Sequence, residues 1–149
     1  MIEYRTGDLF LAGTAAIVNP VNCVGVMGAG LAAQFKRAYP DNFHAYAEAC
    51  RRGDVAPGKM FLFQTGFFTA PSLIVNFPTK RHWRDKSRLE DIELGLTALV
   101  TDVQRHAVQS IAIPPLGCGL GGLEWAQVKP LIEVAFTDGP TQVVVFQPR

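Results

Sequence analysis

The chain has 149 residues, of which 48% are apolar, and its 14 basic residues nearly balance its 13 acidic ones. A chain of this length folds as one domain and buries about two thirds of its unfolded surface. The composition therefore predicts a single domain over residues 1–149, and it excludes a disordered chain and a protein that attracts nucleic acid through its overall charge.

Strand and helix patterns alternate along the chain. Short β-rich runs predict strands, and apolar residues at helical spacing predict helices. The first half is predicted to contain strands at 2–6 and 16–19, helices at 30–39 and from Asp41 to about Arg52, and strands at 59–65 and 72–77. The second half is predicted to contain a helix from Leu89 to about His106, a strand at 110–113, a separate turn at 123–129, a helix at 130–136 and a strand at 142–147.

Local signals set several of these boundaries. Ser87 and Glu90 have the spacing of a capping box at the helix that begins at Leu89, and Asp41 is a candidate helix cap. Pro130 is tolerated only in the first turn of a helix, so we expect the last helix to begin there. The alternation as a whole predicts the α/β class, with an α/β/α sandwich around a central mixed, largely parallel sheet. The default site of such a fold lies at the C-terminal ends of its strands.

The N-terminus and the cysteines indicate the cellular compartment of the protein. The N-terminus lacks the basic and then apolar segments of a signal peptide, and no apolar run approaches 18 residues. Cys23, Cys50 and Cys118 are odd in number and lack metal-ligand spacing. We therefore expect a cytoplasmic protein without a bound metal. The chain stops directly after its last predicted strand, which also fits the N-terminal part of a longer protein.

Seven of the 14 glycines lie in two segments that each follow a strand and lead toward a helix. Glycine permits close backbone approach, so two such loops can direct several N–H groups at a diphosphate. The alternative is that both segments are only tight connections. The glycines concerned are Gly25, Gly28 and Gly30 in the first segment and Gly117, Gly119, Gly121 and Gly122 in the second.

Two other nucleotide-binding patterns fit less well. Residues 28–33 match the dinucleotide fingerprint G-x-G-x-x-A, but about eight residues separate Gly28 from the preceding strand, and position 50 still lies in helical sequence where an acidic residue is required. The P-loop pattern is absent. A dinucleotide-dependent oxidoreductase is therefore a distant alternative, which a nicotinamide absorbance assay would test.

A basic segment follows the strand predicted at 72–77. From Lys80 to Arg88 it contains five Lys or Arg residues, one His, one Trp and one Asp. A basic segment with an aromatic residue can contact phosphates and stack a base, as in proteins that bind single-stranded nucleic acid. The alternative is a solvated surface, in which Lys80 is simply an exposed lysine at a strand end.

Five segments together resemble the macrodomain family, and more narrowly its branch that contains the DarG antitoxins and the terminal ADP-ribose glycohydrolase. In order over residues 6–125 they are "TGDLF", "AAIVNPVN", "GVMGAGLAAQF", "NFPTK" and "PPLGCGLGGLEW". The resemblance covers essentially the whole chain, and "NFPTK" and "GCGLGGLEW" are its most specific parts. It implies an α/β/α fold that binds ADP-ribose.

The resemblance also implies roles for individual residues. Asp8, with Leu9 beside it, corresponds to the residue that binds the adenine amino group, and Asn22 to the asparagine near the distal ribose. Asp8 can alternatively cap a turn. Lys80 corresponds to the lysine that this branch uses for hydrolysis. The remaining residues implied to bind ADP-ribose are Gly28, Ala29, Gly30, Leu31, Thr79, Pro115, Gly117, Cys118, Gly119, Leu120 and Gly121.

One departure from the branch affects the expected mechanism. The terminal ADP-ribose glycohydrolase has an aspartate directly after its "GCGL", where this chain has Gly121. We therefore expect a mechanism centred on Lys80. A lysine amine is a nucleophile only when it is neutral, whereas a charged ammonium can assist the leaving group. The sequence leaves both roles open.

The resemblance finally implies a function. It predicts a hydrolase without metal or redox cofactor that removes ADP-ribose from thymidine bases in single-stranded DNA, acting as the antitoxin of a DNA ADP-ribosyltransferase. The candidate DNA contacts are Arg81, His82, Trp83 and Arg84. Two alternatives remain: a module that binds ADP-ribose without hydrolysing it, and a hydrolase acting on ADP-ribosylated protein.

Overall fold

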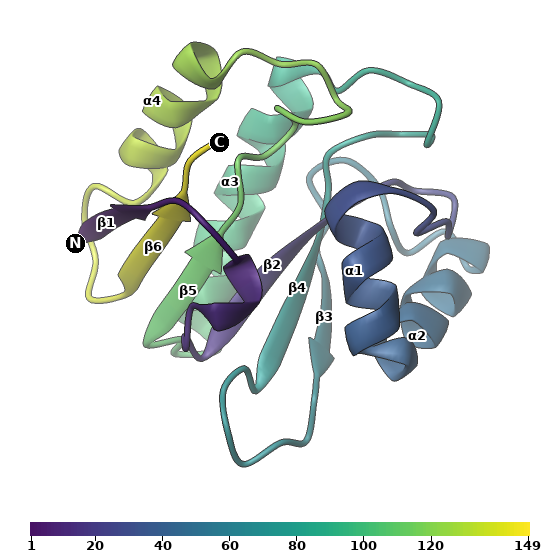
Figure 1. Ribbon diagram of the computed structural model, residues 1–149, viewed down its shortest axis with the longest axis horizontal. Coiled ribbons are helices and arrows are strands. Elements are labelled where there is room, and N and C mark those ends of the chain that lie inside the picture. The colour runs from purple at the N-terminus through teal and green to yellow at the C-terminus, as the bar shows by residue number, and fades with distance from the viewer.

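The computed structural model describes residues 1–149 and contains one six-stranded sheet with helices on both faces (Figure 1). The strands lie in the order β1-β6-β5-β2-β4-β3, and every neighbouring pair is parallel except β3 and β4. The predicted mixed, largely parallel sheet is therefore confirmed. The strands are β1 (Ile2–Arg5), β2 (Ala16–Val21), β3 (Phe61–Gln64), β4 (Leu73–Pro78), β5 (Ser110–Ile113) and β6 (Gln142–Phe146).

The helices form two layers. Along β2, Ala16 and Val18 face the core cluster that contains the buried residues of the third and fourth helices, whereas Ile17 faces the cluster that contains Phe35 of the first helix. This alternation covers both faces of the sheet and confirms the predicted sandwich. The helices are α1 (Gly30–Ala38), α2 (Pro40–Arg51), α3 (Leu89–Arg105) and α4 (Trp125–Ala135), and a short 3-10 helix, η1 (Leu9–Leu11), follows β1.

Strands β2 and β4 end side by side. Their register runs from Ala16 opposite Leu73 to Val21 opposite Pro78. The sequence predicted that β2 ends at residue 19, but it continues through Pro20. Beyond Ile17 this strand has a partner only on the β4 side, so a proline without an N–H group is tolerated there. The segments that follow the two strands consequently emerge next to each other.

The prediction that Pro130 begins a helix was wrong. Helix α4 is continuous from Trp125 to Ala135, with Pro130 inside it, and no separate turn covers residues 123–129. Proline removes the hydrogen bond that would reach the carbonyl of Ala126. Both Ala126 and Pro130 are exposed, so water can satisfy that carbonyl and the loss is tolerated.

Two predicted helix caps were also wrong. No side chain caps α3, and Ser87 faces a glycine-containing loop instead of the helix. Asp41 lies inside the first turn of α2, because the helix already begins at Pro40. Proline is favoured at this first position, where no N–H partner is needed, and the Asp41 carboxylate there still complements the helix dipole.

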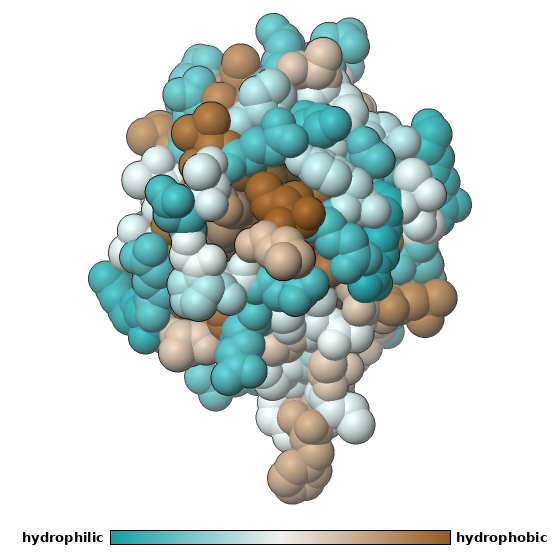
Figure 2. Space-filling model, turned by 90° about the vertical axis from the view of Figure 1, so that its left-hand side faces the viewer, coloured by the Kyte–Doolittle hydropathy of each residue, from teal (hydrophilic) through white to brown (hydrophobic).

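The surface carries one prominent apolar projection. The face in Figure 2 is mainly hydrophilic around a small apolar area, and an apolar knob extends from its lower end, at the height of the β3–β4 loop in Figure 1. That loop contains Phe67 and the fully exposed Phe68. No helix combines the length and the apolar character needed to span a bilayer. No three His, Cys, Asp or Glu side chains come together in a way that could hold a metal ion.

Candidate active site

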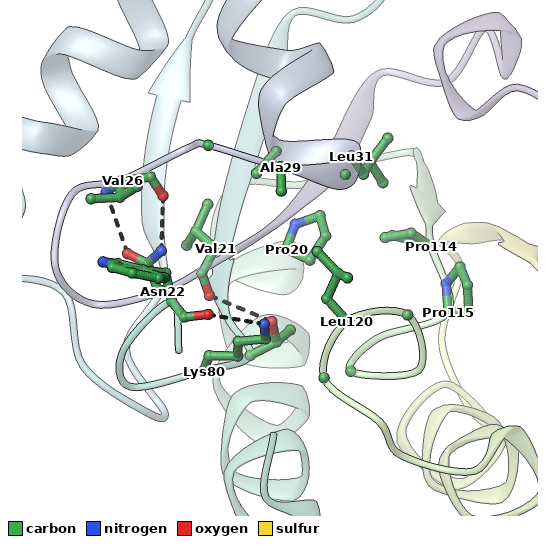
Figure 3. Close-up of a pocket in the computed structure, with 18 residues that line it drawn as sticks. Pro20, Val21, Asn22, Val26, Ala29, Leu31, Lys80, Pro114, Pro115 and Leu120 are labelled. Carbon is green, nitrogen blue, oxygen red and sulfur yellow. Dashed lines mark hydrogen bonds between the residues drawn. The ribbon is translucent and has the colours of Figure 1, made fainter. Parts of the chain in front are cut away.

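A cavity of about 750 Å³ lies at the C-terminal ends of β2, β4 and β5 (Figure 3). This is the edge of the sheet at which the sequence predicted a site. Its wall comes from three segments that are far apart in the chain, residues 20–32, 79–83 and 114–121. The 18 lining residues are Pro20, Val21, Asn22, Val26, Gly28, Ala29, Gly30, Leu31, Ala32, Thr79, Lys80, Trp83, Pro114, Pro115, Gly117, Gly119, Leu120 and Gly121.

Loop 1 (residues 22–29) is organised by Asn22. The Asn22 amide donates to the carbonyl of Val26 at 2.8 Å, and its oxygen accepts from the N–H of Val26 (Figure 3). The same oxygen also accepts from the N–H of Val24. The buried hydroxyl of Tyr46 lies 2.8 Å from the Asn22 side-chain oxygen and 2.7 Å from its carbonyl. Asn22 therefore shapes loop 1, and only one of its amide hydrogens remains for a ligand.

A buried asparagine network supports loop 1 from below. The side chains of Asn42 on α2 and Asn76 on β4 exchange hydrogen bonds of 3.1 and 2.9 Å. Asn19 on β2 donates to Asn76 at 3.0 Å, and its amide also lies 3.8 Å from the sulfur of Met27 in loop 1. All three asparagines are fully buried. The network therefore fixes two strands and a helix beneath the cavity.

Helix α1 begins at the cavity wall. Ala29 precedes its first turn without a side-chain cap, and Gly30, Leu31 and Ala32 line the cavity. The first N–H groups of a helix have no partner within it and carry a partial positive charge. This end of α1 is therefore suited to an anion such as a diphosphate.

Loop 2 (residues 114–124) packs against Ser87. The N–H of Ser87 donates to the carbonyl of Gly121 at 3.0 Å, and Leu123 donates to the carbonyl of Gly117 at 2.9 Å. A Cβ at position 121 would overlap Ser87 Oγ and lie 2.5 Å from the oxygen of Gly117. The glycine at position 121 is therefore required by packing, whatever its role toward a ligand.

Lys80 lies on the cavity wall, two residues after the end of β4. The N–H groups of Thr79 and Lys80 both point to the carbonyl of Val21, at 2.8 and 3.4 Å (Figure 3). The Lys80 ammonium nitrogen donates to the carbonyl of Trp83 at 3.4 Å. Cys23 in loop 1 donates to the carbonyls of Lys80 and Arg81. Lys80 is thus anchored by its backbone, while its side chain faces the cavity.

The other residues of the basic segment differ in their surroundings. Arg81 forms a two-point ion pair with Asp91 of α3, and neither His82 nor Arg84 lines the cavity. Trp83 lines the cavity and is half exposed, with the Arg84 guanidinium 4.9 Å from its ring centroid. Of the four candidate DNA contacts, only Trp83 reaches the cavity wall.

Three residues implied to bind ADP-ribose lie outside the cavity wall. Asp8 accepts a 2.9 Å hydrogen bond from the N–H of Phe10 and caps η1, which is its alternative structural role. Leu9 is buried in the core beside α1, and the Cys118 thiol donates to the carbonyl of Leu116. Asp8 and Leu9 lie at η1 and Cys118 lies in loop 2, and none of the three lines this cavity.

The two loop cysteines are poor nucleophiles. Burial raises the pKa of the Cys23 thiol to about 11, and burial likewise raises the pKa of Cys118 to about 11. A thiol attacks only as the thiolate, which such values make scarce at neutral pH. The burial of both thiols is typical of packing residues. Among the side chains that line the cavity, Lys80 carries the one amine.

The sequence did not single out five of the lining residues. These residues line the cavity because distant chain segments meet there, and a local residue pattern does not indicate which segments meet. One signal was available for three of them: they are the sequence neighbours of Asn22, Leu31 and Pro115, which were predicted to bind the ligand. The five residues are Pro20, Val21, Val26, Ala32 and Pro114.

Comparison with known proteins identifies the family. The sequence profile described as "Macro domain" matches residues 18–132. The chain is 50% identical over 148 residues, 99% of its length, to a Mycobacterium tuberculosis protein named "DNA ADP-ribosyl glycohydrolase". It spans only 42% of the length of that relative.

Solved structures give the same result. The macrodomain of Mycobacterium tuberculosis DarG superposes with a TM-score of 0.98 and 49% identity, covering 100% of this chain and 99% of that one. Thermosipho africanus DarTG, solved in complex with ADP-ribose, matches with a TM-score of 0.91 and 34% identity over 99% of this chain and 41% of that one. With sequence and fold in agreement over nearly its whole length, the chain belongs to the macrodomain family.

Proposed function

We propose that this protein is an ADP-ribosyl glycohydrolase that removes ADP-ribose from modified bases in single-stranded DNA. The observation that carries the proposal is the position of Lys80, whose side chain lines the same cavity as the uncapped end of α1 and the glycines of loop 2. Backbone groups suited to an anion and the one amine of the cavity wall thus meet in one space.

The cavity suits a diphosphate flanked by two sugars. Its volume of about 750 Å³ is within the range of ligand pockets, roughly 300–1,000 Å³. The end of α1 and loop 2 can hold the phosphates from two sides through backbone N–H groups. Leu31, Leu120 and Pro115 provide apolar surface for the sugar and base rings (Figure 3). Asn22, which lines the cavity and keeps one amide hydrogen without a partner, is proposed to contact the distal ribose.

The proposed reaction breaks the bond between C1 of the distal ribose and the modified group. The leaving group takes the bonding electrons and a proton, and water supplies the hydroxyl that ends on C1, so that free ADP-ribose is released. Lys80 can act in two ways. As a neutral amine it forms a bond to C1 that water then cleaves, and as an ammonium it stabilises the departing group while water attacks directly.

Two measurements separate these roles. A covalent bond between Lys80 and C1 can open to an imine, so cyanoborohydride added during turnover should leave ADP-ribose attached to the peptide that contains Lys80. Lys80→Arg keeps the charge but removes the nucleophile. A trapped adduct with an inactive arginine variant indicates covalent catalysis. Retained activity in the arginine variant without an adduct indicates the charged role.

The names of relatives support DNA as the acceptor. The Mycobacterium tuberculosis relative is named for DNA, and a Thermosipho africanus relative is named as a fusion of a DNA ADP-ribosyl transferase with a DNA ADP-ribosyl glycohydrolase. We therefore propose a DNA ADP-ribosyltransferase as the functional partner, with this protein reversing its product as an antitoxin.

The test compares two acceptors side by side. The protein is incubated with an ADP-ribosylated single-stranded oligonucleotide and with ADP-ribosylated protein, and released ADP-ribose is quantified. Release from the oligonucleotide alone supports the proposal, and release only from protein assigns the other substrate class. Tight binding of ADP-ribose with no release from either acceptor would make the protein a binding module.

A further inference from the structure

We propose that Trp83 is the surface on which the modified base stacks, and that this contact makes the site selective for nucleic acid over protein acceptors. The inference rests on the proposed function, because it concerns the group that leaves when Lys80 acts. It assigns Trp83 a role in recognising the acceptor that the positive charge of the basic segment alone does not provide.

The segment that carries Trp83, residues 81–86, is held by hydrogen bonds at both of its ends. Before it, the N–H groups of Thr79 and Lys80 point to the carbonyl of Val21. After it, the N–H of Ser87 donates to the carbonyl of Gly121 at 3.0 Å. Residues 82–85 form a tight turn closed by the 3.0 Å hydrogen bond from the N–H of Asp85 to the carbonyl of His82. The ring is therefore presented on a constrained loop, and little conformational freedom is lost when a base binds to it.

Trp83 lies beside the Lys80 amine. Its carbonyl accepts the hydrogen bond from the Lys80 amine, and its side chain lines the same cavity. It is the sole aromatic residue among the 18 that line this cavity. A base that is attached to the ribose carbon facing Lys80 consequently leaves the cavity next to this ring.

The surroundings of the ring favour a stacked base. The Arg84 guanidinium lies 4.9 Å from the ring centroid, and the His82 ring lies 5.1 Å away at a tilt of 36°. The indole is supported by these groups, yet half of its surface is exposed. Arg84 and Lys86 form no ion pair, so both cations are free for the phosphates that flank a modified nucleotide, and no such phosphates accompany an ADP-ribosylated carboxylate.

The free energy of stacking between a base and an aromatic ring sets the loss of affinity expected when Trp83 is replaced. Removal of an aromatic platform weakens the binding of a base by about 5- to 150-fold. A protein side chain esterified to ADP-ribose has no base to stack and should lose little when Trp83 is replaced. The selectivity between acceptors is therefore the quantity that Trp83→Ala should change.

The experiment measures binding in the Lys80→Ala background, where the oligonucleotide stays intact. The affinity of an ADP-ribosylated single-stranded oligonucleotide is compared with that of free ADP-ribose, with Trp83 unaltered, as Trp83→Ala and as Trp83→Phe. We expect the oligonucleotide to bind more tightly than free ADP-ribose, the alanine variant to lose that excess and the phenylalanine variant to retain most of it. Phe68→Ala, which removes an exposed aromatic residue from the β3–β4 loop, is the matched control and should change nothing.

Several outcomes would overturn the inference. They are the absence of any excess affinity for the oligonucleotide, an excess that survives in Trp83→Ala, and an equal loss of affinity for free ADP-ribose. The binding comparison is independent of turnover. If the unaltered protein releases no ADP-ribose from DNA, the proposed function fails, while the comparison still decides whether a base contacts Trp83.

Discussion

The guanidinium of Arg81 pairs with the buried carboxylate of Asp91 through two contacts of 3.1 Å each, Nε to Oδ2 and Nη2 to Oδ1. Asp91 is only 2% exposed, whereas Arg81 is about half exposed. The pair joins the segment after β4 to the first turn of α3. It therefore holds the chain next to Lys80, which makes Arg81 a positioning residue more than a free DNA contact.

Replacing Arg81 by Gln should destabilise the protein. The buried Asp91 carboxylate would lose its charged partner, at a cost of about 1–3 kcal/mol in the free energy of unfolding. Urea denaturation measures this change. The double variant Arg81→Gln/Asp91→Asn should lose less than the sum of the two single variants, because the unpaired charge is absent. Arg84→Gln, at an exposed position without an ion pair, is the control, and additive losses would show that the pair is unimportant.

Gly121→Ala should disrupt loop 2. The new Cβ would overlap Ser87 Oγ and lie 2.5 Å from the Gly117 carbonyl oxygen, so the loop must move. Overpacking of this kind costs about 1–3 kcal/mol, and we also expect weaker ADP-ribose binding. Thermal unfolding and calorimetric titration measure the two effects.

Gly119→Ala is the matched comparison for stability. A Cβ at position 119 meets nothing within 4 Å, although the residue lies in the same loop. Its free energy of unfolding should change by no more than about 0.5 kcal/mol. Equal destabilisation by the two alanines would contradict the packing described for Ser87 and Gly121.

The thiols of Cys23 and Cys118 should react slowly with alkylating reagents at neutral pH. Burial raises the pKa of each to about 11, so roughly one thiol in a thousand is ionised at pH 8, against about a quarter for an ordinary cysteine. Iodoacetamide labelling, followed by mass spectrometry, should accelerate about tenfold per pH unit up to about pH 11 in the folded protein. Rapid labelling of either residue at pH 7 would contradict the burial of these thiols.

Most of the fold was predictable because its signals are local. The runs that form β5 and β6 are nearly continuous apolar stretches, which is the pattern of strands covered on both faces. The errors arose where tertiary context outweighs a local rule. Pro130 sits inside α4 because its surroundings are exposed, and Ser87 does not cap α3 because loop 2 occupies its side chain.

The site was predictable only in part. The glycines located loop 1 and loop 2, and the strand that ends shortly before Lys80 located the amine, because these features can be read directly along the chain. The partners that hold them come from distant segments. No spacing in the sequence indicates that Tyr46 would bind Asn22, that Asp91 would bind Arg81, or that Trp83 would accept a hydrogen bond from Lys80.

The most direct test of the account is the rate at which ADP-ribose is released from an ADP-ribosylated single-stranded oligonucleotide under single-turnover conditions. We predict that Lys80→Ala lowers this rate by about 10²–10⁴-fold while the affinity for free ADP-ribose, measured by calorimetry, changes only a few-fold. Release by Lys80→Ala at a rate close to that of the unaltered protein would contradict the central role assigned to Lys80.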